Sequence, residues 1–301
     1  MNGFLEGKSI AVTGAGRGIG RAVALACAAE GANVVVNDYG VGMHGEDPTS
    51  EVADDVVAEI EAAGGTAVAV ADSVTEMEAG RRIVAAAVER WGQIDGVVCV
   101  AGILRERMLF NMSEDEWDPV IATHLKGTFT VFRAAAEVMR KQQSGSLVAF
   151  TSGAFAASVA QANYSAAKGG IVSLVRSAAA GMNRYGVTAN AVAPIARTRM
   201  AADVPMALAE MGEAEDVAPM VVYLLSDKAR HISGQVYTAV GNKIAVWNQP
   251  REVRAMYSEG RWTPAGIAAR IDAAIGQEEM PILAQLEAYR KAAAAQEKPN
   301  A

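Results

Sequence analysis

Tyr164 and Lys168 are the residues of this sequence whose types and spacing point most directly to chemistry. They lie four residues apart in a segment with a helical pattern, so their side chains share one face. A tyrosine titrates near pH ~10, and a neighbouring cation stabilises the phenolate and lowers its pKa. The pair can therefore act as a general acid and base, although a surface tyrosine beside a solvated lysine has the same spacing.

A glycine-rich turn near the N-terminus gives a second signal. It reads T-G-x-x-x-G-x-G from Thr13 and stands between a short apolar run and a helical pattern. Glycines let the backbone approach a pyrophosphate closely, and the following helix offers free N–H groups to that anion. A tight turn without a ligand is the alternative. We predict a dinucleotide site at Gly14, Arg17, Gly18, Ile19 and Gly20.

Asp38 ends the second apolar run, 24 residues after Gly14. A carboxylate at this place accepts hydrogen bonds from the adenosine ribose hydroxyls and repels a 2′-phosphate, which favours NAD over NADP. Arg17 favours NADP if its guanidinium contacts a 2′-phosphate. If it is a solvated cation, it favours neither dinucleotide. We predict NAD as the cofactor, with NADP less favoured.

Composition limits the remaining classes. The chain has 301 residues, 51% of them apolar, and a net charge of −7 without a basic stripe, so we expect no nucleic-acid partner. Cys27 and Cys99 lie in apolar segments without metal-ligand spacing, so we expect buried thiols and no metal. No apolar run reaches the ~20 residues that cross a bilayer, and the first residues lack a signal-peptide pattern. We expect a cytoplasmic protein.

Short apolar runs alternate with helical patterns along most of the chain. This alternation predicts an α/β fold: a single Rossmann-type, doubly wound parallel sheet with helices on both faces, whose ligands bind at the carboxyl ends of the strands. The last residues have no strand pattern, and Thr263-Pro264 and Pro281 mark two helix starts. We predict a catalytic domain over 1–247 and a helical extension over 248–301 that covers the site or contacts another subunit. The expected strands are 9–13, 33–36, 66–71, 94–100, 146–150 and 187–193, with helices over 17–30, 50–63, up to 91, 113–140 and 163–185, then a helix–strand unit over 215–239.

Taken in order, these segments resemble the short-chain dehydrogenase/reductase family over about residues 7–241. The resemblance implies hydride transfer between a secondary alcohol or ketone and a nicotinamide cofactor. It further implies that Tyr164 exchanges the substrate proton and that Lys168 also contacts the nicotinamide ribose. Other cofactor contacts are implied at Asp72 and Ser73 beside the adenine, at Ala101 and Gly102 after the fourth strand, and at Thr198 beside the nicotinamide amide.

A narrower resemblance appears in segments such as Gln161-Ala162-Asn163-Tyr164 and His124-Leu125-Lys126-Gly127. They are similar to (3R)-hydroxyacyl-CoA dehydrogenase and the type 4 17β-hydroxysteroid dehydrogenase branch. This implies a small hydroxy or keto substrate, either a CoA-linked 3-hydroxyacyl group or a steroid-derived alcohol, and a homodimer or homotetramer. Another small hydrophobic alcohol or ketone, or a non-catalytic protein that binds NAD for structure or regulation, are the alternatives.

The chain departs from the family pattern at several places. Cys99 and Val100 replace two asparagines whose amides tie strands together in the family. His124 stands where an asparagine carbonyl holds a relay water, and it is either an additional acid/base or a packed histidine. The substrate-oxygen donor is Ser152 or Thr151, and we predict Ser152. The stretch from 198 to 215 is short for a substrate lid. We therefore expect the helical extension over 248–301 to supply part of the cover over the substrate.

Overall fold

The computed structural model describes residues 3–41, 49–196, 212–278 and 280–296. The chain divides into two compact units, Met1–Trp247 and Asn248–Ala301. Thr198 lies outside the described residues, as do the rest of 197–211.

In the described part of the first unit, eight strands form one sheet in the order β3-β2-β1-β4-β5-β6-β7-β8. The order runs outward from β1 in both directions, and β1 to β7 pair in parallel, which confirms the predicted doubly wound fold. The strands are β1 (Ser9–Thr13), β2 (Asn33–Asn37), β3 (Thr66–Val70), β4 (Gly96–Cys99), β5 (Gly145–Phe150), β6 (Val187–Pro194), β7 (Val236–Val240) and β8 (Lys243–Val246).

The edge strand β8 was not predicted from the sequence. It runs antiparallel to β7, with Val240 opposite Lys243, so only Gly241 and Asn242 connect the two strands. Gly241 has a φ of +51°, a conformation that glycine adopts without steric cost and that two-residue hairpins require. A four-residue strand after a tight turn leaves too short an alternating pattern to be recognised in the sequence.

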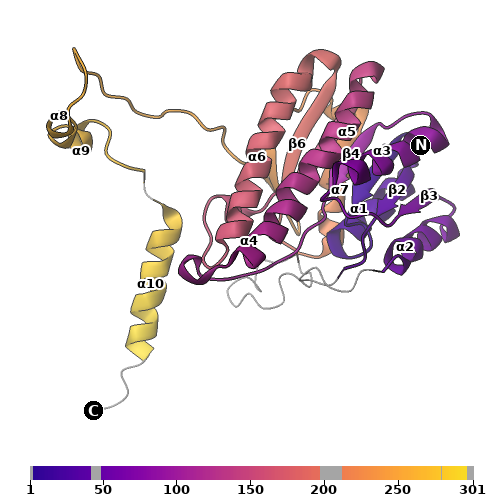
Figure 1. Ribbon diagram of the computed structural model, residues 1–301, viewed down its shortest axis with the longest axis horizontal. Helices are drawn as coiled ribbons and strands as arrows, with labels where there is room; N and C mark the ends of the chain where they lie inside the picture. The colour runs from indigo at the N-terminus through magenta and orange to yellow at the C-terminus, as the bar shows by residue number, and fades with distance from the viewer. Residues whose placement is uncertain (1–2, 42–48, 197–211, 279, 297–301) are drawn as a thin grey trace. The chain divides into compact units, whose positions relative to one another are not determined.

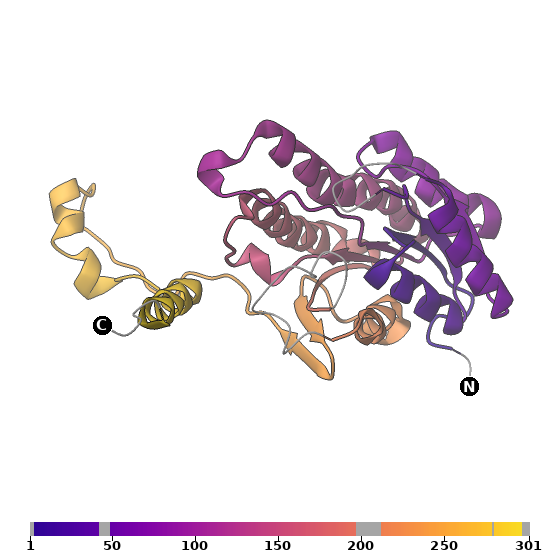
Figure 2. The same cartoon turned by 90° about the horizontal axis from the view of Figure 1, so that it is seen from below.

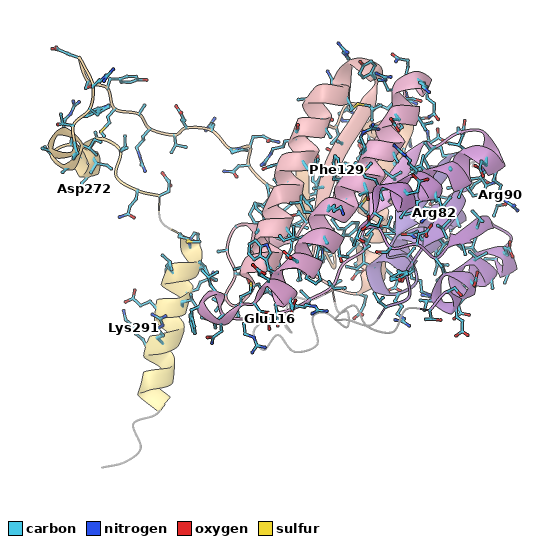
Figure 3. All side chains as sticks on the ribbon, viewed as in Figure 1. Arg82, Arg90, Glu116, Phe129, Asp272 and Lys291 are labelled. Atoms are coloured by element: carbon cyan, nitrogen blue, oxygen red, sulfur yellow. The ribbon has the colours of Figure 1, made fainter. Side chains whose placement is uncertain are left out.

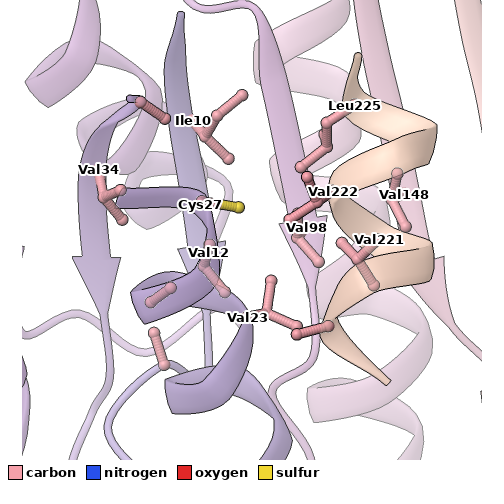
Figure 4. Packing of buried hydrophobic residues seen from close by; sticks show 14 of the residues in the cluster. Ile10, Val12, Val23, Cys27, Val34, Val98, Val148, Val221, Val222 and Leu225 are labelled. Carbon is pink, nitrogen blue, oxygen red and sulfur yellow. The ribbon is translucent and has the colours of Figure 1, made fainter. Parts of the chain in front are cut away.

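Helices cover both faces of the sheet (Figures 1 and 2). Residues alternate along β1, so Ile10 and Val12 enter one core and Ala11 enters the other. Figure 4 shows the first core, where Val23 of α1 and Val221 of α7 face the strands. This face is covered by α1 (Gly18–Ala29), α2 (Glu51–Ala62) and α7 (Ala218–Leu225), and the other by α3 (Met77–Trp91), α5 (Gly127–Gln142) and α6 (Ala162–Met182).

The predicted helix over 113–140 is interrupted. Its first part, α4 (Glu114–Ile121), begins with a capping box in which Ser113 and Glu116 satisfy each other's backbone N–H groups. One wide π-helical turn, η2 (Ala122–Lys126), then separates α4 from α5. Such turns are rare and occur frequently at functional sites. Here the wide turn carries His124.

Short 3₁₀ turns complete the described part of the first unit: η1 (Leu109–Asn111), η3 (Gly153–Phe155), η4 (Asn183–Tyr185), η6 (Ala214–Asp216) and η7 (Asp227–Ala229). The second unit contains α8 (Pro264–Ala268), α9 (Ile271–Ala274) and α10 (Pro281–Gln296). The Thr263 Oγ1 atom accepts a hydrogen bond from the Gly266 N–H at 3.1 Å, which confirms the predicted helix start. The role of this unit as cover or subunit contact remains a prediction.

Candidate active site

A cavity of about 430 Å³ lies at the carboxyl ends of the parallel strands. Loops that follow β1, β2, β3, β4 and β5 contribute to its wall, together with α6 and the π-helical turn. Apart from Ser152, all the predicted site residues within the described ranges line it: Gly14, Arg17, Gly18, Ile19, Gly20, Asp38, Asp72, Ser73, Ala101, Gly102, His124, Tyr164 and Lys168. Thr151 lines it as well.

The glycine turn is shaped by its backbone. Gly14 and Gly18 have φ values of +65° and +52°. A Cβ on Gly14 would lie 2.7 Å from the Ala101 backbone, and one on Gly20 would lie 2.0 Å from the Gly14 carbonyl oxygen. Arg17 precedes α1 without a side-chain cap from the described residues, so the first N–H groups of the helix are available to an anion. This cradle fits a dinucleotide pyrophosphate.

Asp38 is held at the cavity by two backbone donors. Its Oδ2 atom accepts from the Gly16 N–H at 2.8 Å, and its Oδ1 atom accepts from the Gly40 N–H at 2.7 Å. The guanidinium of Arg17 donates instead to the Val41 carbonyl at 3.5 Å. Each carboxylate oxygen keeps a further lone pair for an incoming hydroxyl donor. The carboxylate thus has a fixed position in which it can accept from a ribose.

Asp72 and Ser73 line the cavity where β3 ends. The carboxylate of Asp72 pairs with Arg82 of α3 through two hydrogen bonds of 2.7 and 2.8 Å (Figure 3 labels Arg82). The hydroxyl of Ser73 lies 3.0 Å from that of Thr75. Because Arg82 occupies both oxygens of Asp72, a ligand at this wall must share that carboxylate or use the backbone of the turn.

Tyr164 and Lys168 lie on one face of α6, with the lysine Nζ atom 5.4 Å from the centre of the tyrosine ring. Lys168 is 4% exposed, and its Nζ atom donates to the Phe150 carbonyl at 2.7 Å. Burial lowers the pKa of Lys168 to about 7. The ammonium therefore loses much of its charge near neutral pH.

The direction of the Tyr164 pKa shift differs from the one predicted. Burial raises the pKa above its ordinary value, a side-chain hydrogen bond with Ser152 lowers it, and the Glu106 carboxylate raises it again. Lys168 does not reverse the effect, because it is itself buried and only partly charged near neutral pH. Burial keeps the phenol protonated in the structure as it stands.

Ser152 and Thr151 have different partners, although they are neighbours. The Thr151 hydroxyl is buried and donates to the Lys168 carbonyl of α6 at 2.9 Å. The Ser152 side chain interacts with Tyr164, and its Oγ atom accepts from the Ala154 N–H at 3.2 Å. The proton of Thr151 is thus committed to the protein, whereas Ser152 stands beside the phenol. This geometry favours Ser152 as the substrate-oxygen donor.

His124 is 2% exposed and packed against the loop that follows β4. Its Nε2 atom lies 2.8 Å from the Ile103 carbonyl oxygen and 3.2 Å from the Ile103 nitrogen. A Cβ on Gly102 would lie 2.1 Å from the imidazole Cε1 atom. Burial and the nearby Lys168 ammonium hold the pKa of His124 well below its ordinary value, although the hydrogen bond with the Ile103 backbone acts in the opposite direction. These contacts favour a neutral, packed imidazole, and an acid/base role of His124 remains a prediction.

The ring of His124 also meets that of Tyr164 edge to face, with the centres 5.1 Å apart. The backbone carbonyl of His124 accepts from the Thr128 hydroxyl at 2.7 Å. This carbonyl belongs to the π-helical turn, where it stands outside the regular α-helical pattern. Its use by a relay water remains a prediction.

Two side chains, those of Thr13 and Asn37, hold the site together in a way that was not predicted from the sequence. The Thr13 Oγ1 atom accepts from the Val100 and Ala101 N–H groups at 3.2 and 3.4 Å. The Asn37 amide donates to the Val70 and Asp72 carbonyls, both at 2.9 Å. These contacts tie the ends of β1 to β4 and of β2 to β3, although Cys99 and Val100 carry no amide. The polar residue that ends each of these apolar runs was the feature of the sequence from which these contacts could have been predicted.

Two further properties concern the described ranges only. They contain no group of three or more histidine, cysteine, aspartate or glutamate side chains arranged to hold a metal ion. No helix in these ranges combines the length and apolar character needed to span a membrane.

Comparisons with known proteins agree with the geometry. A family model described as enoyl-(acyl carrier protein) reductase matches residues 14–241. Hydroxyacyl-CoA dehydrogenase ChsB1 of Mycobacterium tuberculosis is 40% identical over 89% of this chain and 88% of its own length. Peroxisomal multifunctional enzyme type 2 of mouse is 42% identical over 78% of this chain, which corresponds to 32% of that longer protein. A short chain dehydrogenase of Mycobacterium avium, solved by crystallography, is 45% identical, with a TM-score of 0.83 over 92% of this chain and 97% of that one.

Proposed function

The chain belongs to the short-chain dehydrogenase/reductase family, and on this basis we propose that it is an NAD-dependent dehydrogenase of a 3-hydroxyacyl-CoA or steroid-derived secondary alcohol. The observation that carries the proposal is the meeting of Tyr164, Lys168 and the Ser152 hydroxyl beside a cavity with a dinucleotide cradle. A protein that only bound the dinucleotide would not need a buried phenol and amine at this place.

Relatives support the substrate class. The relative from Mycobacterium tuberculosis is named a hydroxyacyl-CoA dehydrogenase, and it matches this chain over nearly its whole length. The chain also matches part of a peroxisomal multifunctional enzyme over 78% of its length. A 3-hydroxyacyl group and a hydroxysteroid share a secondary alcohol on an apolar body, which suits the same chemistry. Between them, the relative named a hydroxyacyl-CoA dehydrogenase, which is matched over 88% of its own length, favours the CoA-linked substrate.

Each catalytic side chain has a role that its position supports. Tyr164 takes the hydroxyl proton in oxidation and returns it in reduction, and it lies near Lys168 for passage of that proton. Ser152 donates to the substrate oxygen, whose negative charge grows in the transition state. A bound nicotinamide dinucleotide supplies the hydride acceptor or donor. Because the Ser152 donor and the Tyr164 phenol are already in position, water does not have to rearrange around the developing charge.

Asp38 supports NAD as that dinucleotide. Its carboxylate is fixed by Gly16 and Gly40, so it cannot turn away from a 2′-phosphate without losing two hydrogen bonds. Repulsion between two fixed negative groups at short range disfavours NADP. Arg17 lines the cavity, but its guanidinium is directed at the Val41 carbonyl.

A substrate series tests the proposal. NADH formation is measured with a 3-hydroxyacyl-CoA, with the corresponding free 3-hydroxy acid and with a hydroxysteroid, each with NAD and with NADP. We expect the highest kcat/KM with the CoA ester and NAD. Binding of NAD without turnover of any of these alcohols would contradict the proposal and favour a non-catalytic protein.

A further inference from the structure

Asn163 precedes Tyr164 in the first turn of α6, and its side chain is 1% exposed. Its Nδ2 atom donates to the Arg105 carbonyl at 2.8 Å and to the Glu116 carbonyl at 2.7 Å. Its Oδ1 atom accepts from the Tyr164 N–H at 2.7 Å. Both amide protons and the carbonyl oxygen therefore have partners inside the protein.

These three bonds join three separate elements. The Arg105 carbonyl belongs to the loop after β4, which lines the cavity. Glu116 lies in the first turn of α4 (Figure 3), and Tyr164 lies in the first turn of α6. We infer that Asn163 is a positioning residue, which fixes the Tyr164 phenol relative to the cavity wall formed by the loop after β4. The inference rests on the proposed acid/base role of Tyr164.

An amide is the group that this position requires. The Tyr164 N–H is one of the first-turn donors that a helix leaves without an intrahelical partner. The N-cap residue, Gln161, makes no side-chain cap with the described residues, so Asn163 supplies the missing acceptor. A carboxylate would satisfy the same N–H, but it would place negative charge against two carbonyl oxygens. Only an amide combines one acceptor with two donors in this volume.

Other contacts hold the same loop, so the loss of Asn163 should loosen it without unfolding it. Ile103 contacts His124, and the Arg107 N–H donates to the Ala160 carbonyl at 2.8 Å. The Arg107 side chain pairs with Glu116 at 2.8 Å, but the arginine side chain is 55% exposed. Buried hydrogen bonds are stronger and more rigid than exposed ones. The Asn163 bonds therefore set the position of Arg105 relative to Tyr164.

Asn163→Ala is the primary test, with Ser158→Ala as the matched control. Ser158 is exposed and donates to the half-buried Gln161 side chain at 2.6 Å, next to the same turn but outside the buried bonds. We expect Asn163→Ala to lower kcat about 10- to 100-fold, because displacement of a reacting group by about 1 Å has an effect of this size. The affinity for NAD stays within about twofold, since the mutation does not touch the glycine turn. Ser158→Ala keeps wild-type values.

Titration of Tyr164 gives a readout that does not depend on turnover. Tyrosinate absorbance is followed against pH in each background, with and without Tyr164→Phe, so that the difference isolates this phenol. Burial raises the pKa of Tyr164. Admission of water in Asn163→Ala should move its titration to lower pH. Asn163→Ser serves for the same measurements if the alanine variant does not fold.

Asn163→Asp distinguishes the contribution of the two amide donors from that of the amide acceptor. A protonated aspartate keeps one donor and one acceptor, so its kcat relative to that of Asn163→Ala should rise as pH falls. A folded Asn163→Ala or Asn163→Ser protein with wild-type kcat and an unshifted Tyr164 titration overturns the inference, even where Tyr164→Phe abolishes turnover. Retained turnover in Tyr164→Phe overturns the proposed function instead. In that case the Tyr164 titration in Asn163→Ala alone decides whether Asn163 positions the phenol.

Discussion

The two sides of the cavity are built in different ways. The dinucleotide side consists mainly of backbone: glycines with positive φ, the start of α1, and Asp38 held by two N–H groups. The opposite side consists of buried polar side chains, among them Lys168, Thr151 and His124, each no more than 4% exposed. Substitutions on the first side should therefore change which cofactor binds, whereas those on the second should change the reaction rate and the protonation of buried groups.

The largest expected effect is that of Lys168 on the way the free energy of unfolding depends on pH. Its pKa is about 7 in the folded protein and near the ordinary 10.5 when unfolded. Between these values the unfolded chain binds the additional proton, so folded stability rises with pH. Relative to Lys168→Met, the wild-type protein should gain roughly 3–5 kcal/mol of unfolding free energy from pH ~7 to ~10.5.

Denaturant titrations at a series of pH values measure this gain. Lys126→Met is the control, because the Lys126 side chain is 49% exposed and should add no comparable slope. A difference between wild type and Lys168→Met that stays constant with pH would show that Lys168 titrates as an ordinary lysine.

Ser152 and Thr151 give the next largest effect and sharpen the catalytic side. Ser152→Ala should lower kcat about 100-fold, since it removes a fixed donor to the transition state. Thr151→Ser keeps the hydroxyl that donates to the Lys168 carbonyl, so its kcat should stay near that of wild type. Steady-state kinetics on both variants decide the assignment. A kcat near that of wild type in Ser152→Ala would contradict the assignment and leave Thr151 as the donor.

Asp38 tests the dinucleotide side and should have the smallest effect. Asp38→Ser removes the negative charge while leaving the glycine turn in place. The ratio of kcat/KM with NAD to that with NADP should fall about tenfold, because the 2′-phosphate no longer meets a carboxylate. Asp72→Asn is the control, since the Asp72 carboxylate is paired with Arg82. A ratio unchanged by Asp38→Ser would remove Asp38 from cofactor selection.

Much of the fold could be predicted because it depends on local patterns. Apolar runs alternating with helical patterns specify the parallel strands and the helices that connect them. The glycine turn could also be predicted, because positions where two backbone segments approach closely require glycine. The edge strand β8 and the π-helical turn η2 were not predicted, since four strand residues and one widened turn leave hardly any pattern.

The catalytic side was only partly predictable, because its geometry depends on contacts distant in sequence. Asn163 bonds to Arg105 across 58 positions, and Thr13 bonds to Val100 across 87. No spacing rule connects such pairs. The direction of the Tyr164 pKa shift failed for the same reason: residue spacing shows that a lysine is near, but only the packed structure shows that both groups are buried.

Tyr164→Phe is the most direct test of the central claim, that the buried phenol carries the proton in an NAD-dependent alcohol oxidation. NAD affinity and turnover of the best alcohol are measured on the same folded variant. The account predicts NAD affinity within about twofold of wild type and a loss of kcat of about 10³-fold. Turnover within about threefold of wild type would contradict it, since general acid/base catalysis contributes far more than that.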